Sequence, residues 1–168
     1  MYPIDFFFRA AEQYPDRVAL DAPEGQVTYA RLAADVRALA AALQDLAPAP
    51  QTRVALCAGN SSRHILALLA VLASGKIWVP LNYRSTAREI GRILDATEPS
   101  IVIVDAAGDA LVPAGVGQRI SLGADAAGLA VDACWRAPPA ASRCAMPCRA
   151  RPPRPSSSPA APPACPRA

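Results

Sequence analysis

Three short apolar runs alternate with two helical patterns between residues 53 and 104, and this alternation constrains the fold more than any other feature. The runs Arg53–Cys57, Ile77–Val79 and Ile101–Val104 have the length and composition of β-strands. The last of them is continuously β-branched, which is typical of a strand covered on both faces. The order β-α-β-α-β predicts an α/β fold, a parallel-sheet βαβαβ subdomain with crossover helices.

The two helices within this alternation have clear boundary signals. Residues 63–74 are apolar on nearly all sides after His64, so this helix is predicted to be buried, with Gly75 capping its end. Thr86 and Glu89 have the spacing of a capping box, which opens the second helix.

The segment before residue 53 is predicted to add a helix, a strand pair and a longer helix. The long helix carries leucines and a valine at three- and four-residue steps, which gives it one apolar face. A further strand is expected after the alternation. The ranges are 4–14 and 30–46 for the helices, and 17–20, 26–29 and 118–122 for the strands.

Charge divides the chain into two parts. All 14 acidic residues lie in residues 1–132, which have a net charge of −3, whereas residues 133–168 contain six arginines and no Asp, Glu or Lys. The second part is also rich in Pro and Ala and has no helical or strand periodicity. We therefore expect a folded domain over 1–132 followed by a disordered tail over 133–168.

Cysteine spacing and hydropathy give no sign of a metal site or a membrane segment. Of the five cysteines only Cys57 lies in the first part, within an apolar run, so a buried free thiol is expected. The other four lack metal-ligand spacing, and the single histidine is distant in sequence. The longest apolar run, Ile65–Ala73, is far shorter than the roughly 20 residues of a membrane helix. A cytoplasmic protein is the expectation.

Residues 1–132 resemble the N-terminal part of the adenylate-forming enzymes, the AMP-dependent synthetases and ligases. Three stretches carry the resemblance: "FFRAAEQYPDRVAL", "VTYARLAADVRALAAAL" from Val27 to Leu43, and Asn60 to Asp105. Within the third, "VPLNYR" is more similar to acyl-CoA synthetases than to the adenylation domains of peptide synthetases. The resemblance implies attack of a carboxylate on ATP, giving an acyl-adenylate, and then transfer of the acyl group to coenzyme A.

The resemblance also implies features that this sequence lacks. Members of the family need a phosphate-binding loop, residues for Mg²⁺, adenine and ribose, and a catalytic lysine. Lys76 is the only lysine, and no GxxxxGK[ST] pattern is present. We therefore expect no catalytic residue, no metal ligand and no activity from this chain alone, with ATP, Mg²⁺ and CoA implied for the intact family. Arg84 is the one cofactor-binding candidate, for the CoA phosphates, although a surface arginine that begins a helix explains it more simply.

The tail has an interpretation at the level of DNA. Codons can be chosen for Arg154–Ala168 that, read one nucleotide earlier, encode Thr-Gly-Gly-Thr-Thr-Gly-Leu-Pro-Lys-Gly, the family's phosphate-loop pattern. A frameshift near residues 132–134 would then explain the acid-free tail and truncate the domain before its ATP site. A GC-rich coding region whose shifted frame gives Gly and Thr by composition alone is the alternative.

Other residues have simpler structural interpretations. His64 has no nearby nucleophile and fits a surface position at a helix start, residues 60–62 fit an N-cap, and Trp78 fits the core. Two further functions stay open: a non-catalytic α/β binding or regulatory module, and a nucleic-acid binder acting through the arginine tail, which the lack of aromatic and helical patterning disfavours. Since the family packs this region against later sequence, exposed apolar faces and aggregation are also expected.

Overall fold

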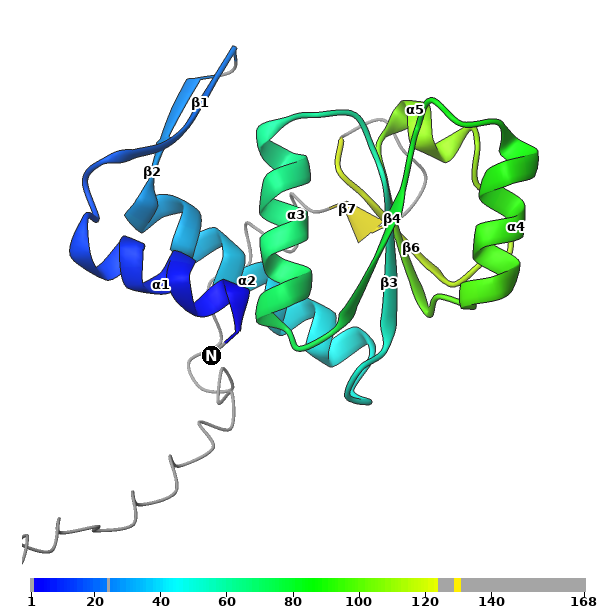
Figure 1. The fold of residues 1–168 in the computed structure, drawn as a ribbon, viewed down its shortest axis with the longest axis horizontal. Coiled ribbons are helices and arrows are strands. Elements are labelled where there is room, and N and C mark those ends of the chain that lie inside the picture. The colour runs from blue at the N-terminus through cyan, green and yellow to red at the C-terminus, as the bar shows by residue number, and fades with distance from the viewer. Residues whose placement is uncertain (1, 24, 124–128, 131–168) are drawn as a thin grey trace, which may run out of the picture.

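The computed structural model describes residues 2–23, 25–123 and 129–130 (Figure 1). The predicted tail, 133–168, lies outside these residues. The elements, in chain order, are α1 (Pro3–Gln13), β1 (Val18–Ala22), β2 (Gly25–Thr28), α2 (Tyr29–Leu46), β3 (Arg53–Cys57), α3 (Ser62–Ala73), β4 (Ile77–Leu81), α4 (Ala87–Thr97), β5 (Ile101–Val104), α5 (Ala106–Asp109), β6 (Gln118–Ser121) and β7 (Leu129–Ala130).

The predicted βαβαβ unit is present and forms the centre of a parallel sheet. The strand order is β4-β3-β5-β6-β7, and every neighbouring pair is parallel. The chain therefore moves outward from β3 to the edge strand β4, and then crosses back over β3 to β5. Because these two crossovers go to opposite sides of β3, α3 and α4 cover opposite faces of the sheet (Figure 1).

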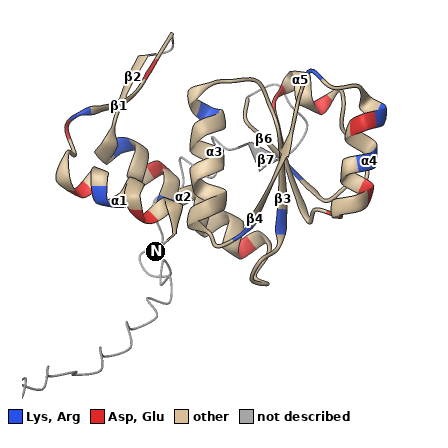
Figure 2. Ribbon diagram, in the orientation of Figure 1, with Lys and Arg blue, Asp and Glu red and all other residues tan. Residues whose placement is uncertain are grey.

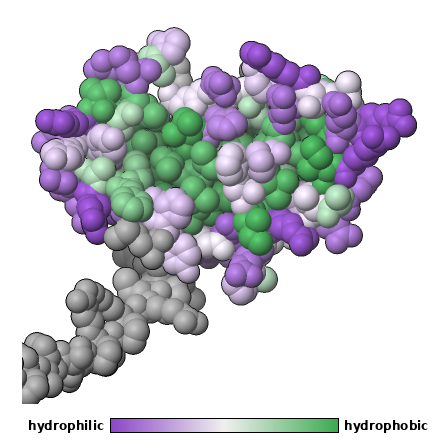
Figure 3. Space-filling model, viewed as in Figure 1, coloured by the Kyte–Doolittle hydropathy of each residue, from purple (hydrophilic) through white to green (hydrophobic). Residues whose placement is uncertain are grey.

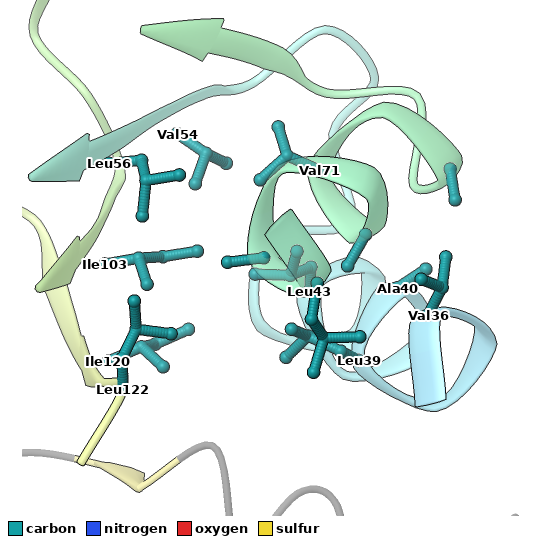
Figure 4. Packing of buried hydrophobic residues seen from close by; sticks show 14 of the residues in the cluster. Val36, Leu39, Ala40, Leu43, Val54, Leu56, Val71, Ile103, Ile120 and Leu122 are labelled. Carbon is teal, nitrogen blue, oxygen red and sulfur yellow. The ribbon is translucent and has the colours of Figure 1, made fainter. Parts of the chain in front are cut away.

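Each face of the sheet has its own apolar core. Val54 and Leu56 of β3 point to one face, where they pack with α2, α3, β5 and β6 (Figure 4). The alternate residues Ala55 and Cys57 point to the other face, where they pack against α4. All four residues of β5 are buried, as expected for a β-branched strand covered on both sides.

The N-terminal segment forms a separate antiparallel hairpin, β1–β2, beside the helices α1 and α2 (Figure 1). Thr28 caps α2 by accepting a hydrogen bond from the backbone N–H of Arg31, at 3.3 Å. Tyr29 begins the helix with its ring 6.2 Å from that of Phe7 on α1. Thr28 therefore caps α2, and Tyr29 packs against α1.

Lys76 is buried and fixes the loop between α2 and β3. Its ammonium group donates to the carbonyls of Ala47 and Ala49, the latter at 2.7 Å, and lies 3.4 Å from the hydroxyl of Thr52. Burial lowers the pKa of Lys76 below its ordinary value. The lysine thus satisfies carbonyls at and beyond the end of α2, a structural role consistent with its lack of a phosphate-loop context.

Three expectations about residues 63–81 were wrong in part. The strand that begins at Ile77 does not end at Val79, because β4 extends through Pro80 to Leu81, and Trp78 is 37% exposed instead of lying in the core. The cause is the position of β4 at the sheet edge, which tolerates proline and leaves side chains open on one side. The helix predicted to be buried on all sides, α3, keeps Ile65 38% exposed.

Among the described residues, no helix has the length and apolar character needed to cross a membrane.

Candidate functional site at the carboxyl edge of the sheet

The candidate site is the edge of the sheet where the parallel strands end. The segment after β3 leads into α3, the segment after β4 leads into α4, and Asp105 directly follows β5. Connections from β3 and β5 leave toward opposite faces, so a topological switch point lies between these two strands. Open parallel sheets bind ligands at such points, just beyond the carboxyl ends of the strands.

Asp105 ties two of these segments together. One carboxylate oxygen accepts a hydrogen bond from the backbone N–H of Gly59, after β3, at 2.7 Å, and the other accepts from the N–H of Gly108, also at 2.7 Å. The second bond caps α5, for which Asp105 is the N-cap residue. A single side chain therefore fixes the spacing between the ends of β3 and β5.

Gly108 allows the short helix α5 to lie directly against β3. A Cβ atom at this position would stand 1.8 Å from the carbonyl oxygen of Cys57 and 3.2 Å from its sulfur. The Cys57 thiol is buried, as predicted, and burial together with the nearby charge of Asp105 raises its pKa to about 11. This cysteine is therefore protonated at neutral pH and unsuited to act as a nucleophile.

Arg84, the predicted cofactor-binding residue, lies at this edge in the turn between β4 and α4. Its Nε donates to the hydroxyl of Tyr83 at 3.1 Å, and its guanidinium lies 5.5 Å from the centre of the Tyr83 ring. Asn82 holds the turn by accepting from the backbone N–H of Arg84, at 3.0 Å. The side chain of Arg84 is exposed, so its terminal nitrogens are accessible to an anion.

The start of α3 completes the edge. Ser61 is the N-cap and accepts from the backbone N–H of His64 at 3.2 Å, which agrees with the predicted capping role of this turn. The imidazole Nδ1 of His64 lies 3.1 Å from the carbonyl oxygen of Ala58, so this ring makes a local contact. Arg63 reaches across to the carbonyl of Leu122, at the end of β6, at 2.6 Å.

A shallow pocket of about 370 Å³ lies beside this helix start. It is lined by residues 20–23 of the hairpin and, on the other side, by residues 60–62 and Ile65. The hydroxyl of Ser62 is buried and has no hydrogen-bond partner among the described residues. Since Asp21 also lines the pocket, its charge disfavours an anionic occupant.

The described residues contain no catalytic constellation. No group of three or more His, Cys, Asp or Glu side chains within them could hold a metal ion. The carboxylate of Asp105 is occupied by two backbone donors, and His64 is not paired with a nucleophile. What this edge offers is an accessible guanidinium beside a tyrosine ring, an arrangement that can bind a phosphate or a carboxylate.

Of the residues at this edge, Arg84 was predicted as a binding residue and Asp105 was not. A signal was available, because an aspartate that directly follows a buried strand and precedes a glycine by three residues has the position of an N-cap at the carboxyl edge of a sheet. Pairing with Gly59 could not be foreseen, since it depends on β3 and β5 being neighbours.

The sequence model of one family, described as AMP-binding enzyme, matches residues 7–160. Among curated proteins, the AMB antimetabolite synthetase AmbB of Pseudomonas aeruginosa is 33% identical over 100 residues, which is 60% of this chain and 8% of AmbB. Two other relatives, from a Lecanicillium species and from Fusarium pseudograminearum, are described as nonribosomal peptide synthetases. The chain therefore spans only a small part of the curated proteins that it matches.

Solved structures with the same fold include both peptide-synthetase and ligase proteins. The N-terminal subdomain of Klebsiella oxytoca NpsA, in complex with 3-hydroxybenzoyl-AMSN, is 32% identical with a TM-score of 0.63 and shares 71% of this chain and 30% of its own. A Rhodopseudomonas palustris protein described as a long-chain-fatty-acid CoA ligase is 26% identical with a TM-score of 0.73, over 80% of this chain and 36% of its own.

Proposed function

Because this chain belongs to the AMP-binding enzyme family, we propose that it is the first part of an enzyme that activates a carboxylic acid with ATP and passes the acyl group to coenzyme A. The observation that carries the adenylation step is the family match over residues 7–160. The choice of CoA as acceptor rests on the "VPLNYR" motif and is supported by the similarity to the Rhodopseudomonas ligase.

A second candidate acceptor is a carrier protein. Several of the curated relatives are described as nonribosomal peptide synthetases, and one related NpsA structure is described as an artificially fused adenylation–PCP di-domain. This alternative shares the adenylation step with the first and differs only in the group that receives the acyl chain.

A different class of function is a non-catalytic binding or regulatory module. It is supported by the well-packed core on each face of the sheet in the described part of the chain.

In this proposal the described residues bind and position a reactant, and the chain does not complete the reaction by itself. Arg84 would contact a phosphate of CoA, with Tyr83 holding its guanidinium in place. Mg²⁺ has no candidate ligand set among the described residues, so we assign it no role there. The sequence has no GxxxxGK[ST] loop to hold the phosphates of ATP.

The first test is an assay of pyrophosphate release from ATP by the purified chain with a panel of carboxylic acids. We expect no turnover above the rate without protein, because the phosphate-binding residues are absent from the sequence. Turnover that survives repurification would contradict this part of the proposal.

Sequencing the coding DNA from codon 125 to beyond codon 168 tests the frameshift, which predicts an extra nucleotide near codon 133.

The second test concerns the acceptor. CoA binding to the chain is measured by ligand-observed NMR for Arg84→Gln and for the matched control Arg88→Gln, an exposed arginine one helical turn further on. We expect weak binding that Arg84→Gln reduces at least fivefold and Arg88→Gln leaves unchanged, since only Arg84 stands beside Tyr83. Equal effects of both variants would remove CoA from the proposal and favour the carrier protein.

A further inference from the structure

The proposed reaction assigns no role to the pocket beside the start of α3. This pocket of about 370 Å³ lies between residues 20–23 of the hairpin and residues 60–62 and 65 around the start of the helix. It includes neither Tyr83 nor Arg84, the residues proposed to bind CoA. Ligand pockets of this size are typically apolar recesses in which a few polar groups orient the ligand.

The apolar part of the pocket lining comes from both the hairpin and the helix. It consists of Leu20, Ala22, Pro23 and Ile65. Leu20 packs against the core behind the pocket, whereas Ile65 is 38% exposed. Figure 3 shows hydrophobic residues gathered between the hairpin and α3. A short hydrocarbon group bound here would therefore remove apolar surface from water on both sides of the pocket.

Three polar side chains in the pocket lining have no hydrogen-bond or ion-pair partner among the described residues. They are Asp21 on β1, Asn60 in the turn after β3, and Ser62, the first residue of α3. By contrast, Ser61 is occupied as the N-cap, because it accepts from the backbone N–H of His64. The hydroxyl of Ser62 is buried, and a buried hydroxyl without a partner lowers stability unless a bound group supplies one.

The charge in the pocket favours a cation. Among the described residues that line it, only Asp21 is charged, and Figure 2 shows an acidic residue on the hairpin. Arg63 follows Ser62 in sequence but does not line the pocket; its guanidinium donates to the carbonyl of Leu122 at 2.6 Å. The start of α3 contributes a partial positive charge of roughly half an elementary charge, which is smaller than the full charge of the carboxylate.

We propose that this pocket binds a small primary amine in its ammonium form, with the ammonium group beside Asp21 and the apolar body between Leu20 and Ile65. A primary ammonium group has three N–H donors, and Asp21, Asn60 and Ser62 each carry an oxygen that can accept one. An amine with a short hydrocarbon chain matches both the charge and the apolar lining. The inference rests on the pocket alone and requires neither the acid, ATP nor CoA of the proposed function.

The test is an NMR titration of the full chain at pH 7 with three probes of equal chain length: n-butylammonium, n-butanol and n-butyrate. The protein is kept below the concentration at which light scattering begins to rise. We expect n-butylammonium to bind in the millimolar range, at least fivefold more tightly than n-butanol, and n-butyrate not to bind. The amide signals that shift should be those of residues 20–22 and 60–65, on the two sides of the pocket.

Two variants and one control test the assigned residues. Asp21→Asn should weaken n-butylammonium binding at least fivefold, because it removes the charge in the pocket. The matched control is Asp16→Asn, which makes the same change at an exposed position in the turn before β1, outside the pocket lining, and should leave binding unchanged. Ser62→Ala should weaken binding at least twofold, since it removes one of the three acceptors.

Four outcomes would overturn the proposal: no binding of n-butylammonium, equal affinity for n-butanol, equal effects of Asp21→Asn and Asp16→Asn, or shifted signals that lie outside the pocket. Circular dichroism checks that each variant folds. If Asp21→Asn unfolds, the comparison of the three probes and the Ser62→Ala variant decide the matter. Amine binding requires no turnover and no CoA, so failure of the pyrophosphate or CoA test leaves this result unaffected.

Discussion

At the scale of single residues, the carboxyl edge of the sheet depends on Asp105, whose two oxygens accept from the N–H groups of Gly59 and Gly108. Asparagine has the same shape but only one acceptor oxygen, and its NH₂ group would face a backbone donor. We expect Asp105→Asn to lower the free energy of unfolding by about 1.5–3 kcal/mol, the range for hydrogen bonds to charged groups. Urea denaturation measures this loss.

The exposed Asp95 on α4 supplies the control for this prediction, because Asp95→Asn makes the same chemical change at a solvent-facing position. It should alter the unfolding free energy by less than about 0.5 kcal/mol. Equal effects of the two variants would show that charge alone, and not the bridge between the strand ends, is responsible.

Cys57 gives a second prediction at this scale, for alkaline pH. Its pKa in the folded chain is about 11, raised from 9.0 by burial and by the charge of Asp105. A raised pKa means that the unfolded chain loses its proton first, so the stabilising contribution is complete below about pH 9 and is lost as pH rises through about 11.

The measurement is urea denaturation between pH 8 and pH 10.5, on a chain whose other four cysteines are replaced by serine. We expect stability to fall with pH in this range, and to fall less when Cys57→Ala removes the titrating group. Identical pH profiles for the two chains would mean that the thiol titrates equally in the folded and unfolded states.

At the scale of elements, hydrogen bonds in the first turn fix where helix α4 begins. Thr86 accepts from the backbone N–H of Glu89 at 3.3 Å, and the carboxylate of Glu89 accepts from the N–H of Thr86 at 2.9 Å. Thr86→Ala removes one half of this capping box and should lower stability by about 1 kcal/mol. The hydrogen bonds to Thr86 lower the pKa of Glu89, so the contribution of Glu89 is present above its unfolded pKa and is lost as pH falls through the folded value.

Denaturation of wild type, Thr86→Ala and Glu89→Gln at pH 7 and pH 3 tests both statements. The difference between wild type and Glu89→Gln should shrink at the lower pH, because the stabilising contribution of the Glu89 charge decreases as pH falls. A difference that is unchanged by pH would indicate that the charge of Glu89 plays no part in the cap.

Elements with strong periodicity or boundary residues could be predicted from the sequence. The structure confirms the capping box of Thr86 and Glu89, the buried strand β5 and the apolar face of α2. Helix α5 was missed because four residues carry no periodicity, and the extent of β4 was wrong because Pro80 ends a central strand but not an edge strand. The order of strands in a sheet depends on contacts between residues far apart in sequence. The sequence therefore did not reveal that Asp105 would accept a hydrogen bond from Gly59.

At the scale of the whole molecule, the two sides of the sheet differ in what they present to water. The α4 side is charged, whereas the α3 side keeps an apolar stripe that includes Ile65 and Leu69. This asymmetry predicts how the purified chain behaves in solution.

We expect the purified chain to form open-ended aggregates whose size grows with concentration. An exposed apolar stripe such as that on α3 promotes association without fixing the number of copies. Ile65→Lys should raise the concentration at which light scattering increases by at least threefold, since it places a charge on the apolar stripe. Ile93→Lys adds the same charge at an equally exposed position on α4 and should have little effect. If both lysines raise solubility alike, net charge governs association, and the side of α3 that carries Ile65 is then an ordinary surface of the fold.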